Sequence, residues 1–411
     1  MNYELFIAKR IIAGKKHKSS ISSPIIKIAI TAISLGMIIM LISVATSTGL
    51  QEKIRNKMAG FKGHILITNY DNNNSEISIY PLDKRQDFYP NFPNINGIEN
   101  IQVFANKGGI IRTTTDFEGV LLKGVGTDYN WTFFKEYLQE GRLPNYQLPR
   151  NKEVLLSKTM VDKLQLHLND TISVLFQKST NSKLPSRRKY IIVGIYNSGF
   201  DQFDKQMMIG DIREVQRLNK WNENEIGGFE IVLYSFNDID SIGSAVYKNI
   251  PSTLNSVTIK EAYPSVFEWI ELFDNNVQFI IAIMILIAGI NMITALLVLI
   301  LERVKMIGIL KALGSSNWSI RKIFLYNATY LILKGLFWGN LIGLCILFIQ
   351  KHFHIISLDP TTYYVSSVPV SFNLWMILIL NIGTLVLCFL MLLIPSVIIT
   401  KISPSKSIRF S

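Results

Sequence analysis

The sequence predicts an α-helical membrane protein with four transmembrane helices and one large mixed α+β domain between the first and the second. The main observation is that 49% of the 411 residues are hydrophobic and that they gather in four long windows. Each window is at least as long as the roughly 20 residues that a helix needs to cross a hydrocarbon core of about 30 Å. The windows are residues 28–50, 277–301, 325–349 and 374–400.

Charge is nearly absent from these windows, since Lys334 is their only charged residue. A backbone in lipid must satisfy its polar groups internally, so each window is expected to be a helix. The first window follows 27 residues of chain and is longer than the 7–15 apolar residues of a secretory signal peptide. We therefore expect an uncleaved transmembrane helix there.

Basic residues indicate the orientation of the helices. Residues 1–27 carry six Lys or Arg against Glu4, and residues 302–324 carry five against Glu302. The region 51–276 holds 26 basic and 27 acidic residues. Because positive charge favours the cytoplasmic side, we expect 1–27, 302–324 and the tail 401–411 inside the cell. The region 51–276 and the loop 350–373 are then outside, and the net charge of +12 does not indicate nucleic-acid binding.

The outer region 51–276 is predicted to be mixed α and β. Short runs rich in Ile, Val and Leu predict strands, namely HILITNY, GVLLKGV, DTISVLF, KYIIVGIY and FEIVLYS. Stretches with helical spacing lie between them, as in LLSKTMVDKLQL, where Ser157 can cap a helix. Residues 61–127 and 229–262 are expected to form one porter-like subdomain, with a β-rich subdomain, 128–228, inserted. The two cysteines, Cys345 and Cys388, lie in the windows, so no disulfide is expected outside.

Motifs for catalysis or metal binding are not found in the sequence. There is no G-x-x-x-x-G-K-[ST] phosphate loop, no H-E-x-x-H, no G-x-S-x-G and no Cys-pair metal spacing. His352 and His354 are taken as loop residues, and Asp201 and Asp204 as parts of a turn. The chain is therefore expected to be non-catalytic and to bind no cofactor or metal.

The basic segment 302–324 is predicted to be a helix, a sharp break and a short helix that leads into the third span. Helical spacing of apolar residues, at Met306, Ile309, Leu310 and Leu313, extends helix two past the membrane. Gly314 suits a left-handed stop, and Ser315 or Ser316 can cap the next helix. In that helix Ile320 shares a face with Ile323 and Phe324, while the opposite face carries Trp318, Arg321 and Lys322. The segment is either an interfacial hairpin on anionic lipid or a docking element for a cytoplasmic partner.

The same segment resembles a known family. LERVKMIGILKALGSSNWSIRKIFL is similar to the cytoplasmic loop of FtsX/MacB-type ABC transporter permeases, where E-[RK]-x-x-x-I-[AG]-[IV]-L-[RK]-[AT]-L-G joins helices two and three. The amino-terminal 65 residues, VLLSKTMVDKLQLHLNDTISVLF and YIIVGIYNSGFDQFD resemble the lipoprotein-releasing (LolC/LolE-type) branch. The likeness covers nearly the whole chain and departs at Lys334, where that branch has a small or apolar residue.

The resemblance implies a permease subunit in the bacterial inner membrane that works by mechanotransmission. Two such subunits, identical or paralogous, would pair with a cytoplasmic ATPase dimer that binds the ATP and Mg. The branch extracts lipoproteins from the outer leaflet and passes them to a periplasmic carrier. The residues 314–316, Trp318 and 320–322 would contact the ATPase.

Two alternatives stay open at this point. The same fold serves MacB-like efflux and FtsX-like mechanotransmission to other partners. A membrane receptor with a periplasmic sensing domain is an alternative of another class, although the cytoplasmic segments are too short to form a signalling domain of their own.

A polar stretch, residues 177–188, joins two β-rich runs and predicts a hairpin with a long tip. A protruding hairpin at the matching place in the lipoprotein-releasing branch holds the soluble carrier, which implies the same role here. The residues expected to contact the carrier are Gln177, Lys178, Ser179, Leu184 and Pro185. The alternative is a solvated hairpin tip.

Lys334 is the one charge expected inside the membrane. A lysine at the centre of a span costs about 2.5–3.5 kcal/mol on insertion scales, so it usually faces protein or water. Asn340 and Asn381 are its candidate neighbours. A long side chain that reaches the interface is the alternative.

The charge distribution gives a testable topology. With Cys345 and Cys388 replaced by alanine, a cysteine at Ser316 should resist an impermeant thiol reagent added to intact cells and react after lysis. A cysteine at Asn222, in the region expected outside, should react in both cases. Labelling of Ser316→Cys from outside would contradict the predicted orientation.

Overall fold

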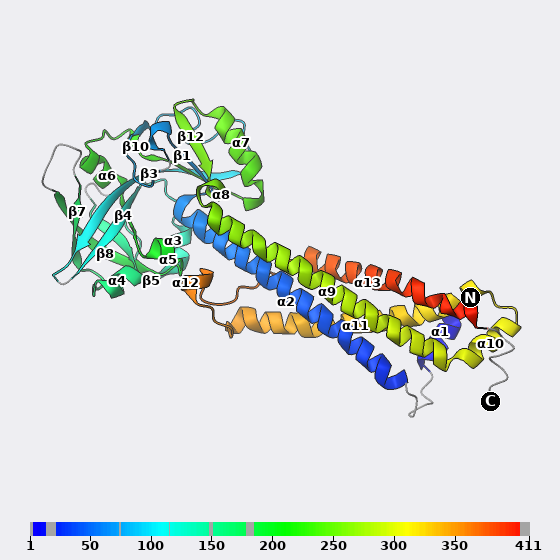
Figure 1. Ribbon diagram of the computed structural model, residues 1–411. Helices are drawn as coiled ribbons and strands as arrows, with labels where there is room; N and C mark the ends of the chain where they lie inside the picture. Colours follow the sequence, from blue (N-terminus) through cyan, green and yellow to red (C-terminus); the bar gives the residue numbers. More distant parts are fainter. Residues whose placement is uncertain are drawn as a thin grey trace. The chain divides into compact units, whose positions relative to one another are not determined.

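The computed structural model describes residues 3–13, 22–73, 75–114, 116–147, 151–177 and 185–402, which form two compact units. The membrane unit comprises Met1–Leu50, Ile270–Ile356 and Val368–Ser411. The outer unit comprises Gln51–Trp269 and Ser357–Ser367. Figure 1 shows long helices in the first and a sheet with short helices in the second.

All four windows predicted to cross a membrane lie in helices that are long and apolar enough to do so. These helices are α2 (Ser22–Lys62), α9 (Pro264–Glu302), α11 (Asn317–Phe353) and α13 (Leu374–Ser396), the last followed by α14 (Ile398–Lys401). α2 has 41 residues and α9 has 39, so each is about 60 Å long, roughly twice the thickness of a hydrocarbon core. Both therefore continue into the outer unit, beyond the windows predicted for them.

α11 packs closely on α2 through glycines spaced one turn apart. A Cβ atom added to Gly335 would lie 2.7 Å from Ile33 Cβ, and one added to Gly339 would lie 2.7 Å from Met37 Cβ. The Ser34 hydroxyl donates to the Gly335 carbonyl at 2.9 Å. Small residues permit this close approach in lipid, where packing and interhelical hydrogen bonds hold helices together.

The structure adds a helix within the segment 1–27 that the sequence analysis did not predict. This helix, α1 (Tyr3–Ala13), packs on α11 and buries Ala8. The Ser319 hydroxyl donates to the Glu4 carboxylate at 2.8 Å, and the Tyr3 hydroxyl lies 3.4 Å from the Ser315 hydroxyl. A helix of 11 residues is marginally stable by itself in water, and the contacts to α11 supply stabilisation.

The described part of the outer unit contains a ten-stranded sheet in the order β12–β1–β11–β3–β4–β9–β6–β8–β5, with β7 paired to β3 and β8. Its strands are β1 (Ile65–Asn69), β3 (Ile98–Arg112), β4 (Phe117–Val125), β5 (Leu138–Gly141), β6 (Glu153–Ser157), β7 (Thr171–Phe176), β8 (Ser186–Tyr196), β9 (Met207–Asp211), β11 (Gly228–Leu233) and β12 (Leu254–Thr258). A separate pair joins β2 (Leu82–Asp83) to β10 (Glu225–Ile226). All five runs predicted to be strands are strands.

Short helices complete the outer unit. They are α3 (Thr132–Tyr137), α4 (Lys158–Lys163), α5 (Asp201–Asp204), α6 (Ile212–Asn219), α7 (Ile239–Asn249), α8 (Ile259–Ala262) and α12 (Pro360–Tyr363), with 3₁₀ turns at Tyr70–Asn72 and Phe236–Asp238. Ser157 caps α4 as predicted, because its side chain accepts a hydrogen bond from the Met160 amide. α6 packs on β3, β4 and β9, and α7 packs on β12.

Strands from the proposed porter-like part and the proposed insertion belong to the same sheet. β4 pairs with β9 in parallel, and β3 pairs with β7 in antiparallel orientation. The division at 128–228 stays a prediction. A continuous sheet transmits strain more directly than two subdomains joined by flexible linkers would.

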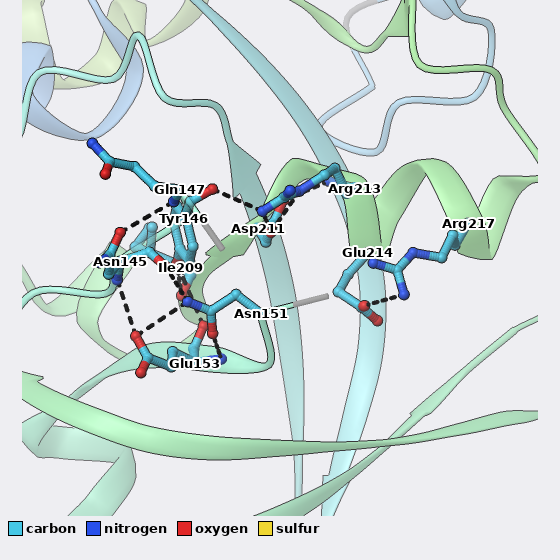
Figure 2. Close-up of polar contacts among 10 residues, drawn as sticks. All are labelled: Asn145, Tyr146, Gln147, Asn151, Glu153, Ile209, Asp211, Arg213, Glu214 and Arg217. Carbon is cyan, nitrogen blue, oxygen red and sulfur yellow. Dashed lines mark hydrogen bonds and ion pairs between the residues drawn. The ribbon is translucent and has the colours of Figure 1, made fainter. Parts of the chain in front are cut away.

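The segment between β5 and β6 is fixed to α6 by polar contacts (Figure 2). Arg213 donates to the Tyr146 carbonyl at 2.8 Å and pairs with the buried Asp211 at 2.5 Å. Glu153 accepts a hydrogen bond from the Asn145 amide at 3.0 Å and pairs with Arg142. Charge-assisted bonds of this kind hold a loop in one geometry.

The packing of α2 on α11 predicts a position-specific effect of bulk. Gly339→Leu should lower the thermal stability of the purified protein, since overpacking costs about 1–3 kcal/mol. Gly383→Leu is the matched control, because a Cβ at Gly383 would meet nothing within 4 Å. Equal melting temperatures for the two variants would contradict the close approach at Gly339.

Candidate coupling and docking sites

The loop between α9 and α11 contains the residues expected to contact a cytoplasmic partner. α9 ends at Glu302, and α10 (Val304–Ala312) follows after an interruption at Arg303. Gly314 adopts the expected left-handed conformation, with φ +91°. Ser316 caps α11 by accepting a hydrogen bond from an amide of its first turn at 3.2 Å.

One prediction for this loop is wrong: helix two does not continue as one amphipathic helix, because Arg303 interrupts it. The helix expected after the break, leading into span three, is the first part of α11, which is unbroken from Asn317 to Phe353. Side chains of its first two turns already pack in the core of the membrane unit, and no helix-breaking residue follows them. These fully buried side chains are Ile320, Ile323 and Phe324.

The exposed face of α10 also differs from the predicted one. Ile307 and Leu310 are buried, whereas Ile309 and Leu313 are 52% and 78% exposed. Because Arg303 interrupts the helix, the helical periodicity of α9 does not determine which side chains of α10 are buried. As a result, the side chains of Ile309 in α10 and of Leu313 at its C-cap are exposed.

Trp318, Arg321 and Lys322 lie together on the first turns of α11, as predicted. The Arg321 guanidinium lies 5.1 Å from the Trp318 ring and the Lys322 ammonium 5.9 Å from it. Arg321 also donates to the Ser396 hydroxyl at 3.0 Å and thereby ties α11 to the end of α13. Trp318 is 52% exposed. Ile309, Leu313 and Trp318 are therefore the exposed large apolar side chains of residues 302–324.

The C-terminal end of α14 is fastened to the same loop. The Lys311 ammonium donates to the Ile399 carbonyl at 2.8 Å and to the Ile402 carbonyl at 2.7 Å. A cation at a helix C-terminus satisfies carbonyls that lack partners within the helix. Lys311 and Arg321 thus connect this loop to the last helices of the membrane unit.

The predicted hairpin is formed by β7 and β8, which pair from Thr171↔Ile191 to Phe176↔Ser186. Gln177 and Pro185 flank its tip and are exposed. The other residues expected to contact the carrier, Lys178, Ser179 and Leu184, lie outside the described residues. The role of the tip stays a prediction.

One face of the sheet beside the hairpin carries apolar side chains among cations. Ile110 of β3 lies opposite Leu175 of β7, which lies opposite Arg187 of β8. Opposed residues of paired strands point to the same side. The exposed members of this face are Ile110, Arg112, Phe117, Arg187, Lys189 and Ile191. We call these residues the hairpin face.

The polar residues of the spans do not form one cluster. Asn340 and Asn381 exchange two amide hydrogen bonds, of 2.6 and 3.0 Å, between α11 and α13. Lys334 is exposed, with its ammonium 4.8 Å from the Tyr330 ring. The expectation that the two asparagines neighbour Lys334 is wrong, because six residues along a helix lead to a different face.

Comparisons with known proteins match these features to known families. The MacB-like periplasmic core domain matches residues 28–246, and the FtsX-like permease C-terminal domain matches residues 278–404. The chain belongs to the FtsX/MacB-type ABC transporter permeases. It is therefore a multi-pass membrane permease subunit, a non-catalytic component of its family.

Relatives of this permease match it over nearly its whole length. The lipoprotein-releasing system transmembrane protein LolC of Buchnera aphidicola is 22% identical over 394 residues, 93% of this chain and 92% of that protein. LolC of Neisseria meningitidis is 19% identical, and the alignment covers 99% of both chains. LolE of Haemophilus influenzae is 19% identical, again over 99% of both. The solved periplasmic region of MacB from Actinobacillus actinomycetemcomitans covers 49% of this chain and 91% of its own, with 14% identity and a TM-score of 0.34.

A buried ion pair, which the sequence analysis missed, fastens the end of α2 to the sheet of the permease. Lys123 and Glu230 are each 1% exposed, and Lys123 Nζ lies 2.6 Å from Glu230 Oε1. Lys123 Nζ also donates to the Phe61 carbonyl at 2.5 Å. Phe61 lies in the last turn of α2, where carbonyls lack helical partners and a cation is favoured.

The remaining partners of this pair come from the neighbouring strand. Glu230 accepts a hydrogen bond from the Gln102 side-chain amide at 2.9 Å, and the side-chain oxygen of Gln102, Oε1, accepts one from the Asn130 backbone amide at 2.9 Å. Burial lowers the pKa of Lys123, and the Glu230 carboxylate opposes that shift. The sequence does contain a signal for this ion pair, namely one lysine in the predicted strand GVLLKGV and one glutamate in FEIVLYS. Opposite charges inside apolar strands indicate a buried pair.

Two other buried groups of the outer unit have shifted pKa values. Burial lowers the pKa of His64 to about 4, so it is neutral at pH 7, and its Nδ1 accepts a hydrogen bond from the Leu233 amide. Burial raises the pKa of Asp204 to about 6. Asp201 instead pairs with Lys205, and the stretch expected to be a turn is the one-turn helix α5. The described residues contain no group of three metal-ligating side chains.

Removal of one partner of the Lys123–Glu230 pair should be far more costly than removal of both. Lys123→Met leaves a buried carboxylate unpaired, which costs about 3–5 kcal/mol. The double variant Lys123→Met/Glu230→Leu should recover most of this loss. Thermal unfolding of the purified permease measures both. A double variant as unstable as the single one would contradict the account.

Proposed function

We propose that this permease is part of an ABC transporter that extracts lipoproteins from the outer leaflet of the bacterial inner membrane and delivers them to a periplasmic carrier. The observation that carries the proposal is the full-length similarity to proteins named as LolC and LolE. Both termini of the permease and the loop 302–324 would face the cytoplasm, in agreement with the charge distribution.

The energy would come from a separate ATPase dimer that binds ATP and Mg. The sequence has no phosphate-binding loop of its own. The exposed apolar side chains of Ile309, Leu313 and Trp318 are a suitable docking surface, because large apolar groups at the centre of an interface supply most of its binding energy. Lys322 and the capped turn at Gly314–Ser316 would form its edge.

The continuity of α11 gives this surface a mechanical role. Trp318 lies on the first turn of a helix of 37 residues, so a displacement at the ATPase is carried along one rigid element. Arg321 and Lys311 pass the same displacement to α13 and α14 through their hydrogen bonds. A second permease subunit, identical or paralogous, would complete the transporter.

The hairpin face would hold the carrier. Its cations, Arg112, Arg187 and Lys189, surround apolar side chains, as expected of a site for an acidic protein surface with apolar contacts. Gln177 and Pro185, which follow β7 and precede β8, would also contact the carrier.

The ATPase surface gives a first test. In the variant Leu313→Asp/Trp318→Ala, the permease should insert and remain stable, while the ATPase co-purifies at least tenfold less. The conservative pair Leu313→Met/Trp318→Phe should retain binding, because it keeps the apolar surface. Undiminished co-purification of the ATPase with the first variant would contradict docking at this surface.

The hairpin face gives a second test. Arg187→Glu/Lys189→Glu should reduce carrier pull-down and lipoprotein release at least tenfold, with ATP hydrolysis unchanged. Lys220→Glu/Lys248→Glu makes the same change of charge at two exposed lysines, the C-cap of α6 and a residue of α7, and should have no effect. If the two pairs behave alike, the carrier does not dock on the hairpin face.

A further inference from the structure

The loop that joins α11 to α13 is part of the outer unit, although both helices belong to the membrane unit. An antiparallel bridge between Ser357 and Ser367 closes the loop, and the Leu358 amide donates to the Ser366 carbonyl at 3.0 Å. Val365 is buried. The loop is thus a compact element that packs on the outer unit.

Tyr364 of this loop contacts three other segments of the outer unit. The Tyr364 ring stacks on Phe200, with centroids 4.6 Å apart and planes at 17°. Trp269 meets the same ring edge to face at 5.7 Å. The Lys57 ammonium, near the end of α2, donates to the Tyr364 carbonyl at 2.9 Å. Ring pairs contribute about 0.5–1.5 kcal/mol each beyond burial, and a charge-assisted hydrogen bond adds to this.

The backbone of Tyr364 is strained to permit these contacts. Its φ of +59° lies in the left-handed region, which costs a tyrosine roughly 1–2 kcal/mol. Such a conformation persists where surrounding contacts determine it, and it is typical of functional positions. Here the contacts that determine it come from three separate segments of the outer unit.

The partner surface is itself held in place. Phe200 is fully buried in the turn before α5. The buried Asp204 carboxylate accepts hydrogen bonds from the Ser198 hydroxyl at 2.7 Å and the Gly199 amide at 3.0 Å, and so fixes this turn. Tyr364 therefore rests on a rigid surface.

We propose that Tyr364 is a positioning residue that ties the α11–α13 loop to the outer unit, so that movement of α11 and α13 reaches the outer unit directly. This inference rests on the proposed function. It gives the force from the ATPase a second path, beside the continuous helices α2 and α9. The tie combines an aromatic stack with the Lys57 hydrogen bond.

The test compares three variants in the complete transporter. Tyr364→Asn removes the ring and tolerates the left-handed backbone. It should lower lipoprotein release at least tenfold, with ATP hydrolysis within twofold of wild type. Tyr364→Phe keeps the stack and should restore release. Tyr363→Ala removes the neighbouring exposed ring and should have no effect.

Hydrogen exchange of the loop amides provides a readout that needs no cargo. Residues 357–367 should lose protection in Tyr364→Asn and keep it in Tyr364→Phe. Unchanged protection in Tyr364→Asn would overturn the tie, and lost protection with normal release would overturn its role in coupling. Failure of the wild-type transporter to release lipoproteins would instead refute the proposed function, while the exchange data would still report on the tie.

Discussion

The contact between Lys123 and the last turn of α2 is the constraint on which the rest of the structure depends. The buried ammonium of Lys123 in β4 binds the Phe61 carbonyl of α2 and the Glu230 carboxylate of β11. One side chain therefore connects a helix and two strands. An ion pair without water is rigid, since any separation leaves an uncompensated charge. The pair fastens the last turn of α2, which belongs to the outer unit, to the sheet of that unit. Such an attachment would serve the proposed mechanical role.

The proposed mechanical role would also be served by the ten-stranded sheet in the described part of the outer unit. The strands from β12 to β5 are joined by hydrogen bonds, and the hairpin face lies on that sheet, on β3, β4 and β8. In that role, a displacement at Phe61 would reach the base of the hairpin through packed secondary structure. Tyr364 adds an attachment for the last two spans. Coupling of this kind requires contiguous, rigid contacts, which these residues provide.

The sequence predicted the four spans and the mixed outer region because both depend on local pattern. Long apolar windows define the spans, and Ile/Val/Leu runs define strands such as β8. The Gly314 break and the Ser316 cap were also local and were predicted. The buried face of α10 was not predicted, because the interruption at Arg303 changes which of its side chains are buried.

Long-range contacts account for the remaining differences between the predicted and the observed structure. Lys123 and Glu230 are 107 residues apart, and Tyr364 reaches Phe200 across 164, so no periodicity relates them. Asn340 and Asn381 were expected to be neighbours of Lys334. They are instead hydrogen-bonded to each other, between α11 and α13. The charges in GVLLKGV and FEIVLYS could have been recognised as a pair, but their register depends on the order of the sheet.

Transfer of an acylated lipoprotein in a defined system tests the central claim most directly. Proteoliposomes would hold this permease with its partner subunit, the ATPase and a lipoprotein, with the carrier in solution. The account predicts that the lipoprotein appears on the carrier only with hydrolysable ATP, and that a version without acyl chains is not transferred. Transfer without ATP hydrolysis, or no transfer of lipoprotein by an assembled transporter that hydrolyses ATP, would contradict it.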